Sequence, residues 1–129
     1  MLPTDDEIGL WLDDDHIDRA APPGWTHVTT AHQAIKLLDS GRVVELSLDH
    51  DLADHDLHGR GIDVVNWLAE QQEVYGRILW PRDGFIVHSA NPSGRDAMLQ
   101  VAERYAAKVL RVHRSLTPSG KPRLTFVRS

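Results

Sequence analysis

Residues 43–51, VVELSLDHD, place a short apolar run directly before an acidic end. An apolar run of this length predicts a buried β-strand over Val43–Leu48. The same pattern occurs at residues 8–15, IGLWLDDD, and at residues 84–91, GFIVHSAN. We therefore predict three buried strands, each of which ends in a cluster of polar side chains.

Amphipathic segments separate these runs and predict helices. Apolar residues recur at helical spacing in residues 30–40, 61–72 and 96–108. Thr30 is expected to cap the first helix and Gly41 to end it. Further short strands are expected at the segments 25–29, 109–113 and 123–127, with a hairpin turn at residues 117–122 between the last two.

This alternation of strands and helices is typical of βαβ units, which build a mainly parallel sheet through right-handed crossovers. The C-terminal hairpin is expected to add an antiparallel edge to that sheet. We therefore predict one α/β domain over residues 1–129, with its core at residues 8–113 and the hairpin at residues 109–128.

The composition excludes several classes of protein. The 129 residues include no cysteine, which excludes disulfides, thiolate zinc sites and cysteine nucleophiles. The formal net charge of −5 argues against broad binding to duplex nucleic acid. The sequence has neither a long apolar span nor a start that resembles a signal peptide. We therefore expect a cytoplasmic protein that does not bind membranes.

The polar strand ends predict a site. In open α/β sheets ligands bind beyond the carboxyl ends of the strands, so the clusters at residues 13–15, 49–51 and 88–91 are expected to share one rim. Carboxylates drawn together repel each other unless a cation neutralises them. We therefore predict a hard divalent cation there, Mg²⁺ first and Mn²⁺ or Ca²⁺ next. The alternatives are a solvated loop at residues 13–15 and a polar turn at residues 49–51.

Two further features add chemistry to this rim. Asn91-Pro-Ser-Gly-Arg95 precedes a predicted helix, and backbone N–H groups at a helix start favour anions. The planar guanidinium of Arg95 suits a phosphate group, although an ordinary capping loop is the alternative. His50 and His88 lie beside strand-end clusters, as general acid–base residues do, but a hydrogen-bonding scaffold is the alternative for each.

Taken together, the three clusters resemble the receiver domain of two-component signalling. Asp13 and Asp14 match its acidic pair, Asp49 its phosphate-accepting aspartate, and Ser89 its switch hydroxyl. The resemblance implies a receiver-like, flavodoxin-like fold of three layers, with Mg²⁺ bound through these carboxylates. Receivers carry Lys-Pro right after the fifth strand, whereas Lys121-Pro122 falls in the expected hairpin turn, so the role of Lys121 stays open.

Additional motifs are similar to a divergent group, the cyclic-phosphate processing receiver-like domains. Their pattern is met by Leu10–Asp14, Gly24-Trp25, Ser47–Leu52, Gly61–Val64 and His88–Arg95. The resemblance covers about residues 8–107. It implies a role on cyclic phosphate ends or cyclic nucleotides, so that the expected partner is a phosphorylated small molecule, a nucleotide or an RNA end.

The function that this resemblance implies is a metal-dependent phosphoesterase. The metal ligands are expected to be Asp13, Asp14 and Asp49. Proton transfer is expected from His50 or His88, with Asp51 as an orienting residue or a further ligand, and phosphate binding from Ser89, Asn91, Gly94 and Arg95. Two alternatives stay open: a switch in which Asp49 accepts a phosphoryl group, and a module that binds a phosphorylated ligand without turnover. The substrate and the oligomeric state also stay open.

Overall fold

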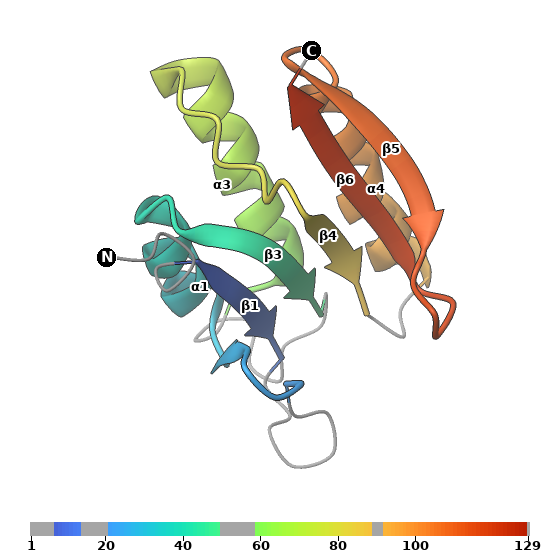
Figure 1. The fold of residues 1–129 in the computed structure, drawn as a ribbon. Coiled ribbons are helices and arrows are strands. Elements are labelled where there is room, and N and C mark those ends of the chain that lie inside the picture. Colours follow the sequence, from blue (N-terminus) through green and yellow to red (C-terminus); the bar gives the residue numbers. More distant parts are fainter. Residues whose placement is uncertain (1–6, 14–20, 50–58, 89–91, 129) are drawn as a thin grey trace.

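The computed structural model shows an α/β protein built on one mixed sheet (Figure 1). It describes residues 7–13, 21–49, 59–88 and 92–128. In chain order the elements are β1 (Ile8–Leu12), β2 (Thr26–Val28), α1 (Ala31–Asp39), β3 (Val43–Leu48), α3 (Gly61–Tyr75), β4 (Gly84–Val87), α4 (Pro92–Ala106), β5 (Leu110–Leu116) and β6 (Pro122–Arg128).

The sheet has the order β2-β1-β3-β4-β6-β5. The first four strands of this order pair in parallel, and β6 pairs antiparallel with both β4 and β5. The hairpin is thus confirmed, but the antiparallel strand lies inside the sheet and not at its edge. Leu124 and Phe126 make β6 apolar enough for the interior, whereas β5 carries exposed arginines that suit an edge strand.

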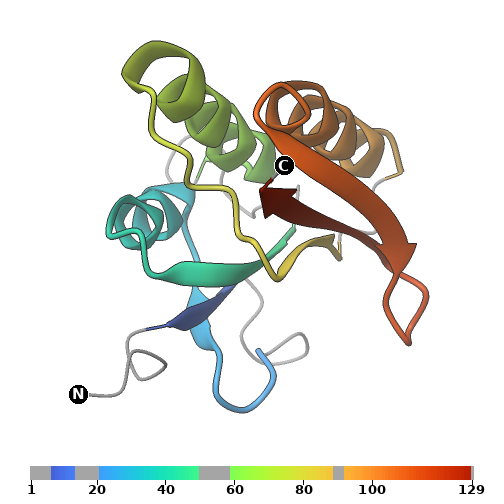
Figure 2. The ribbon, with the colours of Figure 1, turned by 45° about the horizontal axis from the view of Figure 1, so that its top comes forward.

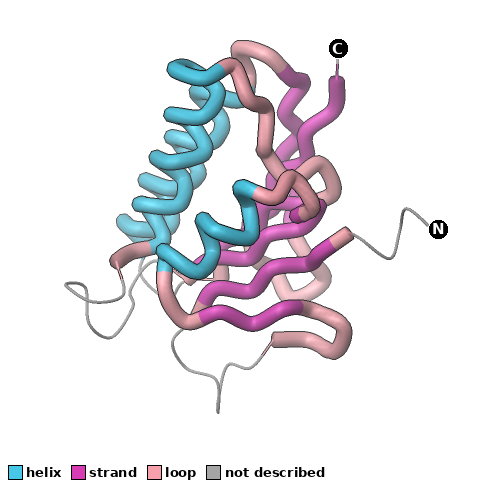
Figure 3. Tube along the Cα trace, turned by 90° about the vertical axis from the view of Figure 1, so that its left-hand side faces the viewer, coloured by secondary structure: helices cyan, strands magenta, loops and turns pink. Residues whose placement is uncertain are grey.

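The described helices all cover the same face of the sheet, as Figure 3 shows from the side. Helix α3 contacts both α1 and α4, and Figure 2 shows α3 and α4 side by side. Their buried residues, among them Leu38, Leu68 and Met98, pack on Leu12 and Phe85 of the strands. The receiver-like sheet is confirmed, and of the three expected layers the described residues form two, a sheet and one helical layer.

Local chemistry explains where the helices begin and end. Thr30 caps α1 as predicted: its hydroxyl accepts a hydrogen bond from the Gln33 N–H at 3.1 Å. The C-cap of α1 is Ser40, and Gly41 follows with a φ of 76°. Helix α4 begins at Pro92 and not at residue 96, because proline suits the first helical turn, where no backbone donor is needed.

The remaining boundaries differ from the predictions by a few residues. Helix α3 runs to Tyr75 and not to residue 72, and it ends at Gly76, whose φ of 67° is left-handed. Helix α4 ends at Ala106, and both hairpin strands are longer than predicted. Among the described helices, none is long and apolar enough to cross a membrane.

Candidate functional site

Backbone hydrogen bonds align the predicted site residues along one rim of the sheet. The N–H groups of Asp13, Asp49 and His88 each donate to a carbonyl of the neighbouring strand, at 3.1, 3.0 and 3.0 Å. The accepting carbonyls belong to Val28, Leu12 and Leu48, respectively. The parallel ladder therefore continues one residue past each strand. It brings Asp13, Asp49 and His88 together at the carboxyl ends of β1, β3 and β4, as predicted.

Both described carboxylates of this rim are buried. Asp13 is 0% and Asp49 is 2% exposed, which rules out a solvated loop or an exposed turn for these two residues. A buried carboxylate is costly unless hydrogen bonds, a partner charge or a metal compensates it. Two carboxylates at adjacent strand ends are also the hard oxygen donors that Mg²⁺ and Mn²⁺ prefer. As a donor set, they therefore fit part of a divalent cation site.

The carboxylates of Asp13 and Asp49 alone do not form a complete set of metal ligands. Among the described residues no group of three or more potential ligands comes together. The expected third ligand, Asp14, lies outside the described residues, as do His50, Asp51, Ser89 and Asn91.

His88 is held at both ring nitrogens. Its Nε2 lies 3.0 Å from Oδ2 of Asp13, and its Nδ1 lies 2.7 Å from Oγ of Ser47, which is buried on β3. The imidazole also stacks on Trp11, with ring centroids 4.2 Å apart and an interplanar angle of 9°. His88 thus reaches from the end of β4 across β3 to β1. These contacts favour the scaffold alternative over a free acid–base residue.

Sequence reasoning missed the partners of His88. Trp11 and Ser47 are register neighbours on β1 and β3, so their side chains lie on one face of the sheet. Trp25 packs edge-on against Trp11, with ring centroids 6.1 Å apart. A Cβ on Gly9 would lie 2.9 Å from the Trp25 ring, so this glycine makes room for the aromatic pair. The period-2 alternation of the strands was the signal that could have found these partners.

A second histidine fixes the backbone of Asp13. Nε2 of His27, on β2, lies 2.6 Å from the Asp13 carbonyl oxygen. A carbonyl only accepts hydrogen bonds, so His27 must donate from Nε2. The edge strand β2 therefore holds the same residue whose carboxylate His88 contacts. Nothing in the local sequence of His27 distinguished it from an ordinary strand residue.

The start of α3 packs directly on Asp49. A Cβ on Gly61 would lie 2.3 Å from the Asp49 carbonyl oxygen and 2.9 Å from Sδ of Met98. Only glycine allows this approach of helix to strand end. The Asp63 carboxylate caps the same helix by accepting from the Arg60 N–H at 2.8 Å. The Gly61–Val64 motif thus has a structural role, which is to seat α3 against the rim.

The first turn of α4 carries the described part of the predicted phosphate loop. Gly94 is buried and Arg95 is half-buried, and both lie within the helix that begins at Pro92. Because α4 follows β4, its N-terminus lies at the carboxyl-end rim of the sheet (Figure 1). Backbone N–H groups of this turn therefore face the same end of the molecule as the carboxylates.

The hairpin brings one further cation to this end of the sheet. Phe85 pairs with Leu124 and Ile86 with Arg123. The same register, if continued by two residues, would set Lys121 opposite His88. The Lys121 carbonyl accepts from the Thr117 N–H at 2.8 Å, so the turn directly follows β5, which extends to Leu116. Lys121 thus lies in the hairpin turn between β5 and β6, as the sequence predicted.

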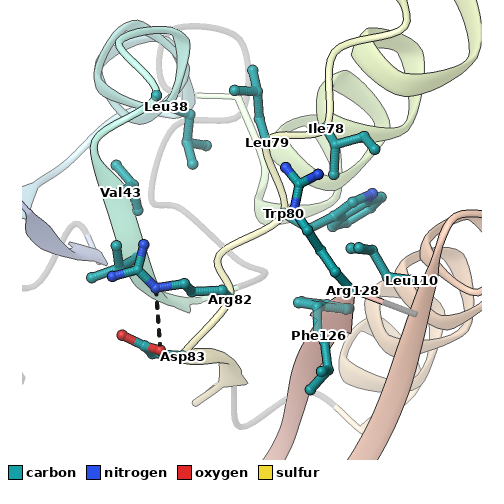
Figure 4. Close-up of a pocket in the computed structure, with 13 residues that line it drawn as sticks. Leu38, Val43, Ile78, Leu79, Trp80, Arg82, Asp83, Leu110, Phe126 and Arg128 are labelled. Atoms are coloured by element: carbon teal, nitrogen blue, oxygen red, sulfur yellow. Dashed lines mark ion pairs between the residues drawn. The ribbon is translucent and has the colours of Figure 1, made fainter.

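A hollow with mainly apolar walls lies elsewhere. A cavity of about 520 Å³ opens near the amino ends of the strands, between the end of α1, the segment before β4 and the hairpin strands (Figure 4). Its walls are mainly apolar, with Leu38, Trp80, Leu110 and Phe126 among them. The cavity contains none of the predicted site residues, so it is not part of the rim.

The parallel order β2-β1-β3-β4, with buried acidic residues at its carboxyl ends, defines a receiver-like α/β protein. A comparison with models of protein families finds the cyclic-phosphate processing receiver domain over residues 8–104. The chain belongs to this family, as its motifs predicted. No curated protein and no solved structure gave a match.

Proposed function

We propose that this protein hydrolyses a cyclic phosphodiester with the help of a divalent cation at the carboxyl-end rim. The observation that carries the proposal is the burial of Asp13 and Asp49 at adjacent strand ends, in a chain whose family is described by cyclic-phosphate processing. The start of α4, which suits a phosphate group, lies at the same end of the sheet as these carboxylates. Hydrolysis uses all of these groups.

Asp13 and Asp49, with Asp14, are the residues that would hold Mg²⁺ or Mn²⁺. A bound cation of this kind polarises a phosphoryl oxygen and lowers the pKa of a bound water. The expected reaction is attack of water on phosphorus, cleavage of one ring P–O bond and formation of a phosphomonoester. One proton leaves the water and one reaches the released oxygen.

The chain's own side chains have separate tasks in this scheme. Arg95, Lys121 and the backbone at Gly94 would bind the non-bridging phosphate oxygens, with Ser89 and Asn91 beside them. His50, oriented by Asp51, is the candidate for proton transfer. His88 is less suited to that task because Asp13 and Ser47 contact its two nitrogens.

The test is product release from a panel of cyclic phosphates. The panel comprises 2′,3′-cyclic mononucleotides, RNA ends with a 2′,3′-cyclic phosphate, and 3′,5′-cyclic nucleotides, each with Mg²⁺, Mn²⁺ or EDTA. We expect cation-dependent release that Asp49→Asn lowers by at least about 100-fold, the effect of removing one electrostatic group from an active site. Asp83→Asn is the matched control, because Asp83 is an exposed carboxylate at the start of β4.

Absence of release from every member of the panel would overturn the hydrolase. Binding of one member without release, seen as a rise in melting temperature that Asp49→Asn removes, would support a sensing module. A stable phosphoryl group on Asp49 after treatment with a small-molecule phosphodonor would support the receiver switch.

A further inference from the structure

The buried chain Ser47–His88–Asp13 links three strands by side-chain contacts. Ser47 lies on β3, His88 directly follows β4 and Asp13 directly follows β1. Their exposed fractions are 1%, 6% and 0%, so solvent hardly reaches any of the three side chains. The Trp11 ring lies flat against the imidazole, with ring centroids 4.2 Å apart. The position of the His88 ring is therefore set by the protein alone.

The hydrogen-bonding capacities of these groups determine where the imidazole proton lies. An ionised carboxylate can only accept, so the contact at 3.0 Å between Asp13 Oδ2 and His88 Nε2 requires a proton on Nε2. In the neutral ring Nδ1 is then an acceptor. The Ser47 hydroxyl, 2.7 Å away, is a donor that matches it. Ser47 thus favours the tautomer that Asp13 needs.

We propose that His88 is a positioning residue for Asp13, and that Ser47 fixes its Nε2–H tautomer. His88 Nε2 contacts Oδ2 of Asp13 at 3.0 Å and so fixes the orientation of this carboxylate. The His27 contact fixes the backbone of the same residue. This inference rests on the proposed role of Asp13 as a cation ligand. It adds that β2, β3 and β4 orient that ligand before any cation binds.

The proposal assigns a task to a buried serine that is otherwise unexplained. A histidine that donates to a ligating carboxylate fixes the orientation of that ligand, and the loss of such a partner weakens metal binding by about 10- to 100-fold. The effect of Ser47 is transmitted only through the histidine. Ser47→Ala is therefore expected to weaken Mn²⁺ binding less than His88→Ala, and Ser47→Thr, which keeps the hydroxyl, is expected to restore it.

The decisive experiment needs no metal and no substrate. Long-range ¹H–¹⁵N spectra of the ¹⁵N-labelled full chain in EDTA report the tautomer of each histidine, and His88→Gln identifies the His88 signals. We expect a single Nε2–H tautomer for His88 and mixed tautomers for His113, which is exposed on β5. An Nδ1–H tautomer or averaged signals for His88 in the wild-type protein would overturn the proposal, even if every variant failed to fold.

Titration with Mn²⁺, followed by electron paramagnetic resonance, separates this inference from the proposed function. Weaker Mn²⁺ binding in His88→Ala, with His113→Ala unchanged, supports the positioning role. Equal affinity in wild type and His88→Ala would refute it. If wild type binds no Mn²⁺ at all, the cation site fails, while the tautomer spectrum still decides whether Ser47 orders His88.

Discussion

The buried side chains at the two ends of the sheet differ in polarity. At the carboxyl ends of the strands, Asp13, Asp49 and His88 are buried polar groups. At the amino ends, the hollow of about 520 Å³ is lined mainly by apolar side chains. The charged residues at this second end, such as Arg82, stay on the surface, where Arg82 bonds Glu7 at 2.6 Å. Charge is therefore buried at one end and exposed at the other.

This difference indicates where the chemistry is. The apolar walls alone would favour the amino-end hollow, since ligand sites are commonly apolar pockets. Burial of a carboxylate opposes folding, however, whereas burial of an apolar wall favours it. Folding alone therefore accounts for the apolar walls of the hollow. It does not account for two buried carboxylates at adjacent strand ends. The comparison predicts that changes at the amino end affect stability and that changes at the rim affect ligand binding.

Phe126→Ala should have the largest effect on stability. Phe126 is 4% exposed and packs on Trp80, with ring centroids 5.6 Å apart. Loss of a buried phenylalanine costs about 3–5 kcal/mol in unfolding free energy. Urea denaturation measures this loss, and a Mn²⁺ titration of the folded fraction should show unchanged affinity. A weaker Mn²⁺ affinity would show that the two ends of the sheet are coupled, which would contradict the comparison.

Gly61→Ala should affect both stability and the rim. The added methyl would lie 2.3 Å from the Asp49 carbonyl oxygen, so helix and strand must move apart, at a cost of about 1–3 kcal/mol. Because Asp49 moves with its carbonyl, Mn²⁺ affinity should fall as well. Urea denaturation and the Mn²⁺ titration measure the two effects on the same sample.

Gly76→Ala is the matched control for that experiment. Gly76 has a φ of 67° and open space around it, so alanine there introduces backbone strain of about 1–2 kcal/mol without a clash. We expect a similar loss of stability with unchanged Mn²⁺ affinity. If both variants lose the same affinity, then global stability and not the position of Asp49 controls the rim.

The rim could be predicted from sequence because its signal is local. A buried strand such as Val43–Leu48 is recognised from its own residues, and the parallel topology then places its polar end beside the other strand ends. The positions of Asp13 and Asp49 could therefore be predicted without knowledge of contacts between residues far apart in sequence. The helices were recognised by the same local periodicity, and a proline at the start of α4 and a glycine at the end of α3 account for two of the misplaced ends.

The arrangement around His88 could not be predicted because it depends on the packing of three strands. Whether an imidazole points to solvent or lies against Trp11 is decided by contacts between residues far apart in sequence. The interior position of β6 has a similar origin. A hairpin pattern defines which strands pair with each other, but not which of them joins β4. That choice follows from the burial of Leu124 and Phe126 on the helix-covered face.

The smallest effect is expected from an exposed ion pair between α3 and the turn that follows α4. Lys108 Nζ lies 2.5 Å from Glu73 Oε1, and their side chains are 51% and 39% exposed. The hydrogen bond from Lys108, followed by that from Gln72, lowers the pKa of Glu73 from its ordinary value of 4.5. A lowered carboxyl pKa stabilises the fold above the unfolded pKa, and this contribution is lost as the pH falls through the folded one.

Glu73→Gln should therefore leave the melting temperature almost unchanged at pH 7, because solvent screens exposed pairs. As the pH falls below about 4.5 the difference between variant and wild type should decrease further, because the unfolded chain takes up the proton first and folded Glu73 follows only below its lowered pKa. Thermal melts between pH 3 and pH 7 measure both the difference in melting temperature at pH 7 and its decrease at lower pH. Asp13→Asn is the contrasting variant, since its carboxylate is buried against His88. If Glu73→Gln changed the melting temperature more than Asp13→Asn does, the division of the molecule into a buried charged end and an exposed charged end would be contradicted.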